Sequence, residues 1–113
     1  MEEEVSGLAG LFKDSIAHVL DFLLIHKRYE YSKKEIAHYS GIGYKTLLEN
    51  WNKLEQYQLV KPTKTVQGNT LYTLNMDSVI VKALKKLQHE VMFYDAEKIA
   101  SYELKRAPIA AIQ

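Results

Sequence analysis

A helix-start signal followed by a glycine turn, both inside the stretch Ser32–Pro62, constrains the fold of this chain more than any other feature. The tetrapeptide SKKE at the start of the stretch matches a capping box, in which the serine hydroxyl and the glutamate carboxylate satisfy the free amides of a helix start. The pattern predicts a short helix over about Lys33–Tyr39. Gly41 is free to adopt positive φ and end that helix, and a second helix is expected over about Tyr44–Tyr57.

Both helices of this pair carry apolar residues at helical spacing. In the first, Ile36 and Ala37 are expected in the core, with Tyr39 beside them. In the second, Leu47, Trp51 and Leu54 lie four and three residues apart, on one face. This register places the single tryptophan in the core and not on an exposed stacking surface. The pair therefore predicts a compact unit with one face committed to packing.

The segments on either side complete the order of elements. A helix is expected from Leu8 to His26, followed by a short strand over residues 29–31. After the helix pair, apolar residues flank QGN, which predicts a β-hairpin with its turn at Gly68-Asn69. A last helix should begin near Ser78, capped by Asn75 or Asp77, and it is either continuous or broken near residues 94–95. The expected fold class is mainly α with a small β-hairpin and an added long C-terminal helix.

Composition bounds the class of protein. The chain has 113 residues, 47% of them apolar and 26% charged, which suits one globular domain. It contains no cysteine, which excludes disulfides, thiolate catalysis and cysteine-based metal sites. Neither a secretory signal nor a membrane span is evident, so we expect a soluble protein. The net charge is only +1, but residues 31–75 hold six lysines against three glutamates, whereas residues 1–30 are net acidic.

Four short motifs in the helix pair carry a family resemblance: EIA at 35–37, GI at 41–42, KTL at 45–47 and KLE at 53–55. With them the chain resembles the winged helix-turn-helix transcriptional regulators, over roughly residues 8–75. The MarR, ArsR and PadR groups share this pattern, as do small regulators of archaea and archaeal viruses. The resemblance implies that the second helix of the pair enters the major groove of DNA and that the hairpin forms a wing on the backbone or minor groove.

The exposed face of that second helix supplies the candidate DNA contacts. Asn50 is the best candidate for reading a base, since its amide can pair bidentately with adenine, and lysines suit phosphates. Leu48 lies between the core stripe and this face, and we expect it to pack on the first helix. The full candidate set is Lys33, Lys34, Tyr44, Lys45, Thr46, Glu49, Asn50, Lys53, Lys64 and Asn69.

The last helix holds a seam of apolar residues at alternating spacings of four and three, namely Ile80, Leu84, Leu87 and Val91. A solitary helix would expose such a seam to water. The seam either packs back on the first helix of the same chain or pairs with a second copy, and we favour a homodimer. The expected organisation is a DNA-binding domain over 1–76, a dimerisation helix over 77–106 and a flexible tail over 107–113.

No catalytic or cofactor chemistry is indicated. The four histidines have no metal-ligand spacing, and no phosphate loop, nucleophile set or paired carboxylates is evident. We therefore expect a non-enzymatic protein in the cytoplasm, at the nucleoid, with duplex DNA and a second copy as partners and with no cofactor, membrane or small-molecule ligand. Two alternatives stay open: a protein–protein assembly module, favoured by Glu49 and the near-neutral charge, and a DNA-binding adaptor in plasmid or viral replication or partition.

Overall fold

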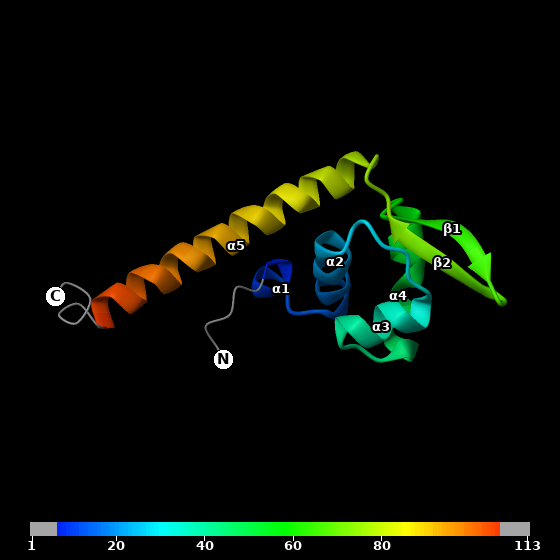
Figure 1. Ribbon diagram of the computed structural model, residues 1–113, viewed down its shortest axis with the longest axis horizontal. Helices are drawn as coiled ribbons and strands as arrows, with labels where there is room; N and C mark the ends of the chain where they lie inside the picture. The colour runs from blue at the N-terminus through cyan, green and yellow to red at the C-terminus, as the bar shows by residue number, and fades with distance from the viewer. Residues whose placement is uncertain (1–6, 107–113) are drawn as a thin grey trace.

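The fold places a helix pair and a hairpin at one end of a long helix (Figure 1). The computed structural model describes residues 7–106, so the proposed tail over 107–113 lies outside the described residues. The elements are α1 (Leu8–Leu11), α2 (Ser15–Ile25), α3 (Lys33–Ser40), α4 (Tyr44–Gln56), β1 (Val60–Val66), β2 (Asn69–Leu74) and α5 (Val79–Arg106). The predicted fold class is confirmed: a mainly α protein with a two-stranded wing and a long C-terminal helix.

The expected single helix from Leu8 to His26 is wrong, because the chain forms two helices with an extended residue, Phe12, at the break. Asp14 adopts a β conformation and caps α2, where its carboxylate accepts a hydrogen bond from the Ala17 amide at 3.0 Å. A side-chain acceptor at this position stabilises a helix start and competes with continuing the preceding helix. The apolar periodicity continues through the break, so the periodicity alone could not reveal where the helix is interrupted.

The helix pair forms as its local signals predict. Ser32 Oγ accepts from the Glu35 amide at 3.2 Å, and the Glu35 carboxylate accepts from the Ser32 amide at 2.9 Å, so the capping box is present. Gly41 ends α3 with φ of 77°, in the left-handed region that glycine adopts without strain. Ile42, in the turn, is half-buried and packs against the core. The turn and the cap therefore fix how α4 leaves α3.

The wing is an antiparallel hairpin with Val60 opposite Leu74 and Val66 opposite Asn69. Its turn is Gln67-Gly68, with φ of 50° and 81°, one residue earlier than expected. Two successive positive φ values match the two-residue turns that follow the right-handed twist of a hairpin. The expected strand over residues 29–31 is reduced to a single bridge, between Tyr31 and Tyr72.

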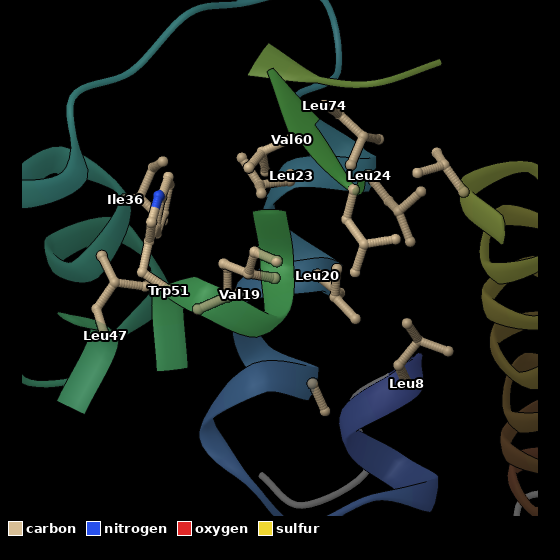
Figure 2. Packing of buried hydrophobic residues seen from close by; sticks show 14 of the residues in the cluster. Leu8, Val19, Leu20, Leu23, Leu24, Ile36, Leu47, Trp51, Val60 and Leu74 are labelled. Carbon is tan, nitrogen blue, oxygen red and sulfur yellow. The ribbon is translucent and has the colours of Figure 1, made fainter. Parts of the chain in front are cut away.

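The core lies where α2, α3, α4 and the base of the wing meet (Figure 2). Leu47 and Leu54 are fully buried and Trp51 is 3% exposed, so the predicted core face of α4 is confirmed. Two side-chain expectations are wrong: Leu48 is 43% exposed and Tyr39 is 57% exposed. Leu48 lies about a quarter of a helical turn from the core centre of α4, on the side of the exposed face. Tyr39 stacks on the half-buried Phe22 at the edge of the core.

Helix α5 is continuous from Val79 to Arg106, and no break occurs near residues 94–95. Ser78 caps it, since its hydroxyl accepts from the Ile80 and Val81 amides, and neither Asn75 nor Asp77 takes that role. The helix passes α2 and α1 and continues beyond them (Figure 1), which gives the molecule its 60 × 27 × 23 Å extents. Its first half therefore packs on the domain and its second half projects from it.

Candidate nucleic-acid interface

The face of α4 opposite its core residues presents a polar row to solvent. Lys45, Glu49 and Asn52 lie on this row at spacings of four and three, and all three are exposed. Lys53 and the exposed Leu48 lie on its two sides, and Tyr44 lies at the start of the helix, 41% exposed. The burial of Leu47, Trp51 and Leu54 leaves this row as the surface that α4 can offer to a partner.

Asn50, the expected base reader, lies between this row and the core face of α4, next to the buried Leu54 around the helix, and is half-buried. Its Nδ2 donates to the Thr46 carbonyl at 2.9 Å, so one amide hydrogen is already bonded within the helix. Asn52 was missed by the sequence reasoning, although it lies on the exposed row. Counting helical positions from Lys45 and Glu49 would have found it, because Asn52 follows Glu49 by three residues and so lies on the same exposed side of the helix.

A polar groove of about 290 Å³ lies between the start of α3, the start of α4 and the tip of the wing. Its lining brings together four of the candidate residues, Lys33, Lys34, Tyr44 and Asn69. Lys34 Nζ lies 5.8 Å from the centre of the Tyr44 ring. Lys33 Nζ lies 4.9 Å from the centre of the Trp51 ring, and this cation–π contact holds the ammonium at the groove.

The wing is attached to the helical domain by several polar contacts. Tyr31 and Tyr72 exchange backbone hydrogen bonds at 2.9 and 2.8 Å, and Thr73 Oγ1 donates to the Tyr29 carbonyl at 3.1 Å. Tyr72 also meets Trp51 edge-on, with ring centres 4.8 Å apart. These contacts fix the wing relative to α4.

Near the wing, neighbouring groups pair with the Lys64 ammonium and raise the pKa of Tyr31. Lys64 Nζ of the wing lies 3.6 Å from the carboxylate of Glu30, in an exposed ion pair with the segment that connects α2 and α3. Desolvation raises the pKa of Tyr31, and the neighbouring Tyr29, Tyr39 and Glu35 raise it further. The Tyr31 hydroxyl therefore stays neutral at physiological pH and adds no negative charge beside the wing.

A second groove, of about 430 Å³, lies between the α1–α2 connection and the α3–α4 turn. It is lined by Lys13 and His18 on one side and by Thr46 at the start of α4 on the other. The sequence reasoning did not connect Lys13 with α4, because 33 positions separate it from Thr46 and no local pattern joins them. Lys13 is thus a further basic side chain beside the exposed start of α4.

The apolar seam of α5 divides between two environments. Leu84 packs against the core and Val91 is half-buried, whereas Ile80 and Leu87 are 40% and 36% exposed. Further along the projecting half, Phe93 and Tyr94 are 63% and 64% exposed. The core-facing residues of α5 are Val81, Leu84 and Gln88. The exposed part of the seam thus lies beside the packed face.

The arrangement of a helix-turn-helix, a wing and a flanking long helix defines a winged-helix domain. No protein-family model matches the chain, and no curated protein matches it by sequence. Solved structures do match it in fold, among them transcription regulators and a member of the MarR family.

Three of these structures show how far the likeness extends. MepR, a transcription regulator of the Staphylococcus aureus multidrug efflux pump MepA, matches with a TM-score of 0.61 at 16% identity, over 88% of this chain and 76% of MepR. Lactococcus lactis ZitR, a zinc-responsive MarR family member, matches with a TM-score of 0.57 at 15% identity, over 84% of this chain and 69% of ZitR. Wild-type ZitR in complex with DNA matches with a TM-score of 0.54 at 16% identity, over 84% and 70% of the two chains. The predicted winged-helix fold is therefore shared with MarR-type regulators.

Within residues 7–106 no group of three or more His, Cys, Asp or Glu side chains could hold a metal ion. None of the helices in that range is both long and apolar enough to cross a membrane.

Proposed function

We propose that this chain is a transcription regulator that binds duplex DNA, with α4 in the major groove and the wing along the backbone. One observation carries the proposal: the exposed row of α4 lies beside a groove that combines Lys33, Lys34 and the wing tip. Such a helix face, with cations on both sides, fits the major groove of a duplex and the two phosphate backbones that border it. That ZitR was solved with DNA supports the same use of this fold.

The candidate residues take different roles in this proposal. Lys33, Lys34, Lys45 and Lys53 contact phosphates, as do Lys64 and Asn69 of the wing. Thr46 and Tyr44 orient the start of α4 against the backbone, and Asn50 and Asn52 contact base edges. Glu49 accepts from a cytosine amino group and repels phosphate, so it favours a defined register over non-specific binding.

The active form in this proposal is a homodimer that uses the exposed side of α5 together with α1. Residues 1–76 then form the DNA-binding domain and residues 77–106 the dimerisation helix. The exposed Ile80, Leu87 and Tyr94 support it, because they lie seven residues apart on one side of α5 and exposed apolar side chains there are stabilised by burial against a partner. Two copies of α4 would enter successive major grooves on a pseudo-palindrome, with half-sites about one helical turn, roughly 34–36 Å, apart. A regulator of this kind acts where the chromosome lies, so the proposal places it at the nucleoid and assigns it no enzymatic activity.

The test is selection from a library of random duplexes at two salt concentrations. The proposal expects retention at low salt, loss of affinity as salt rises, and enrichment of an inverted repeat. Retention of no duplex at low salt would sink the proposal.

A protein–protein assembly module is the second candidate, and one observation favours it. Glu49 lies in the middle of the exposed row, next to Leu48, which is 43% exposed. An acidic and apolar surface suits a protein partner better than a phosphate backbone. The same duplex selection separates the two candidates, because an assembly module would retain no duplex at either salt concentration.

A further inference from the structure

Among the residues whose burial the structure describes, Gln88 is the one buried polar residue, and its side chain is 2% exposed. It lies on the packed face of α5, and its Nε2 donates to Asp21 Oδ1 at 3.0 Å and to the Asp21 carbonyl at 3.4 Å. The two residues are 67 positions apart in the sequence. A buried amide at this place joins the long helix to the middle of α2.

The same carboxylate also holds the start of α1. Asp21 Oδ1 accepts from the Leu8 amide at 2.8 Å, and Oδ2 accepts from the Ala9 amide at 2.9 Å. Gly7 has φ of +66°, and a Cβ there would lie 2.9 Å from Asp21 Oδ1 and 3.2 Å from Gln88 Cγ. The glycine is therefore required both by its backbone conformation and by the closeness of the two side chains. Three elements, α1, α2 and α5, meet at one carboxylate.

This meeting point, the Asp21–Gln88 junction, holds the last fully buried side chain of α5 in the described range, with Val91 and Met92 beyond it half-buried. Before it, Val81 is fully buried and Leu84 packs against the core; after it, Phe93 and Tyr94 are exposed. Apolar contacts such as those of Val81 and Leu84 are non-directional, so they permit a helix to tilt or rotate slightly. Hydrogen bonds weaken steeply when they bend, so the junction defines one orientation of α5.

We propose that Asp21 and Gln88 are positioning residues that set the angle between α5 and the DNA-binding domain. If α5 is the dimerisation helix, this angle also sets the distance between the two copies of α4. The junction then selects the half-site spacing that the dimer accepts, without contacting DNA. This second step rests on the proposed function, whereas the first step concerns the chain alone.

The first experiment measures the angle without DNA. The chain has no cysteine, so the exposed His38 of α3 and Glu97 of α5 can each be replaced by cysteine and spin-labelled without background. Pulsed electron–electron double resonance gives the distribution of distances between the two labels. An excess of unlabelled chain suppresses distances between labels on different protomers. The distribution should be a single narrow peak, broadened or shifted by Gln88→Met, which keeps the side-chain length but removes the donor. The matched control, His89→Met, changes the neighbouring exposed residue and should leave the peak unchanged.

An unchanged peak in Gln88→Met overturns the junction as a positioning device, whatever happens with DNA. Should that variant not fold, Asp21→Asn serves instead. Three donors share two carboxylate oxygens in the native chain, and an amide leaves only one acceptor for them, so the same broadening is expected.

The second experiment tests spacing, on inverted repeats whose half-sites are moved by up to two base pairs. Each base pair displaces a half-site by about 3.4 Å and rotates it around the duplex. The native chain should prefer one spacing by about tenfold or more, and Gln88→Met should reduce that preference to about threefold or less, with the affinity for a single half-site unchanged. Equal spacing preference in both proteins overturns the selection step. If the native chain binds no duplex, the proposed function and the selection of half-site spacing are both refuted. The resonance experiment still decides whether Asp21 and Gln88 set the angle of α5.

Discussion

Replacing Asn52 with alanine should cost more sequence-specific affinity for DNA than replacing Asn50 with alanine. Asn52 is exposed at the C-terminal end of the α4 row, so both polar ends of its amide are available to an adenine. Such a bidentate pair is worth about 1–3 kcal/mol of discrimination. Asn50 must first release the hydrogen bond from its Nδ2 to the Thr46 carbonyl, at 2.9 Å, which has a net worth of about 0.5–1.5 kcal/mol. The difference between the variants is about 1 kcal/mol, roughly fivefold in affinity.

The assay is fluorescence anisotropy with the selected duplex and a scrambled duplex, at two salt concentrations. Alanine has a higher helix propensity than asparagine, so neither variant should lose stability, and a thermal melt checks this. Glu97→Ala, on the projecting half of α5, is the matched control and should bind as the native chain does. The reasoning is refuted if Asn50→Ala loses more specific affinity than Asn52→Ala, or if neither changes the ratio of specific to scrambled binding.

Three further predictions concern charge, assembly and the turn. Lys45→Ala should weaken binding to every duplex and flatten the slope of log affinity against log salt by about 0.9, whereas an unchanged slope would show that Lys45 contacts no phosphate. Leu87→Asp should yield a 13.1 kDa monomer in analytical ultracentrifugation, with Lys82→Asp as a dimeric control; a native chain that is itself monomeric at high micromolar concentration contradicts the dimer. Gly41→Ala should lower the free energy of unfolding by about 1 kcal/mol, because φ is +77° there although the space around it is open. Urea unfolding measures this, and an equal midpoint in both proteins would argue against strain at the turn.

The helix pair could be predicted from the sequence because its signals are local. The capping box needs only Ser32 and Glu35, three residues apart, and the turn needs only a glycine that tolerates positive φ. The core face of α4 follows from a spacing of four and three. The wing turn was misplaced by one residue because Gln67-Gly68 and Gly68-Asn69 are both plausible two-residue turns. Register decides between them, since Val66 pairs with Asn69 and leaves Gln67 in the turn.

The candidate site was predicted less completely, because it depends on contacts between distant segments. The groove beside α4 brings Lys33 and Lys34 next to Asn69, and no pattern within either segment indicates that closeness. The apolar residues of the α5 seam recur at helical spacing, as predicted, but this spacing does not say which side of the helix packs on the domain. Val81 and Gln88 define that side, about a quarter turn from Ile80 and Leu87. A buried glutamine gives no hydrophobic signal, so Gln88 could be found only from the structure.

The unbroken course of α5 restricts how its sequence can change in length. One residue inserted after Gln88 would rotate the following helix by about 100° and advance it by about 1.5 Å. Tyr94 would then face a different direction while Val81 and Gln88 stayed in place. Seven inserted residues restore the face to within about 20° and lengthen the helix by roughly two turns. Insertions and deletions in this helix should therefore be tolerated as heptads, so that relatives of this chain would differ there by whole pairs of turns.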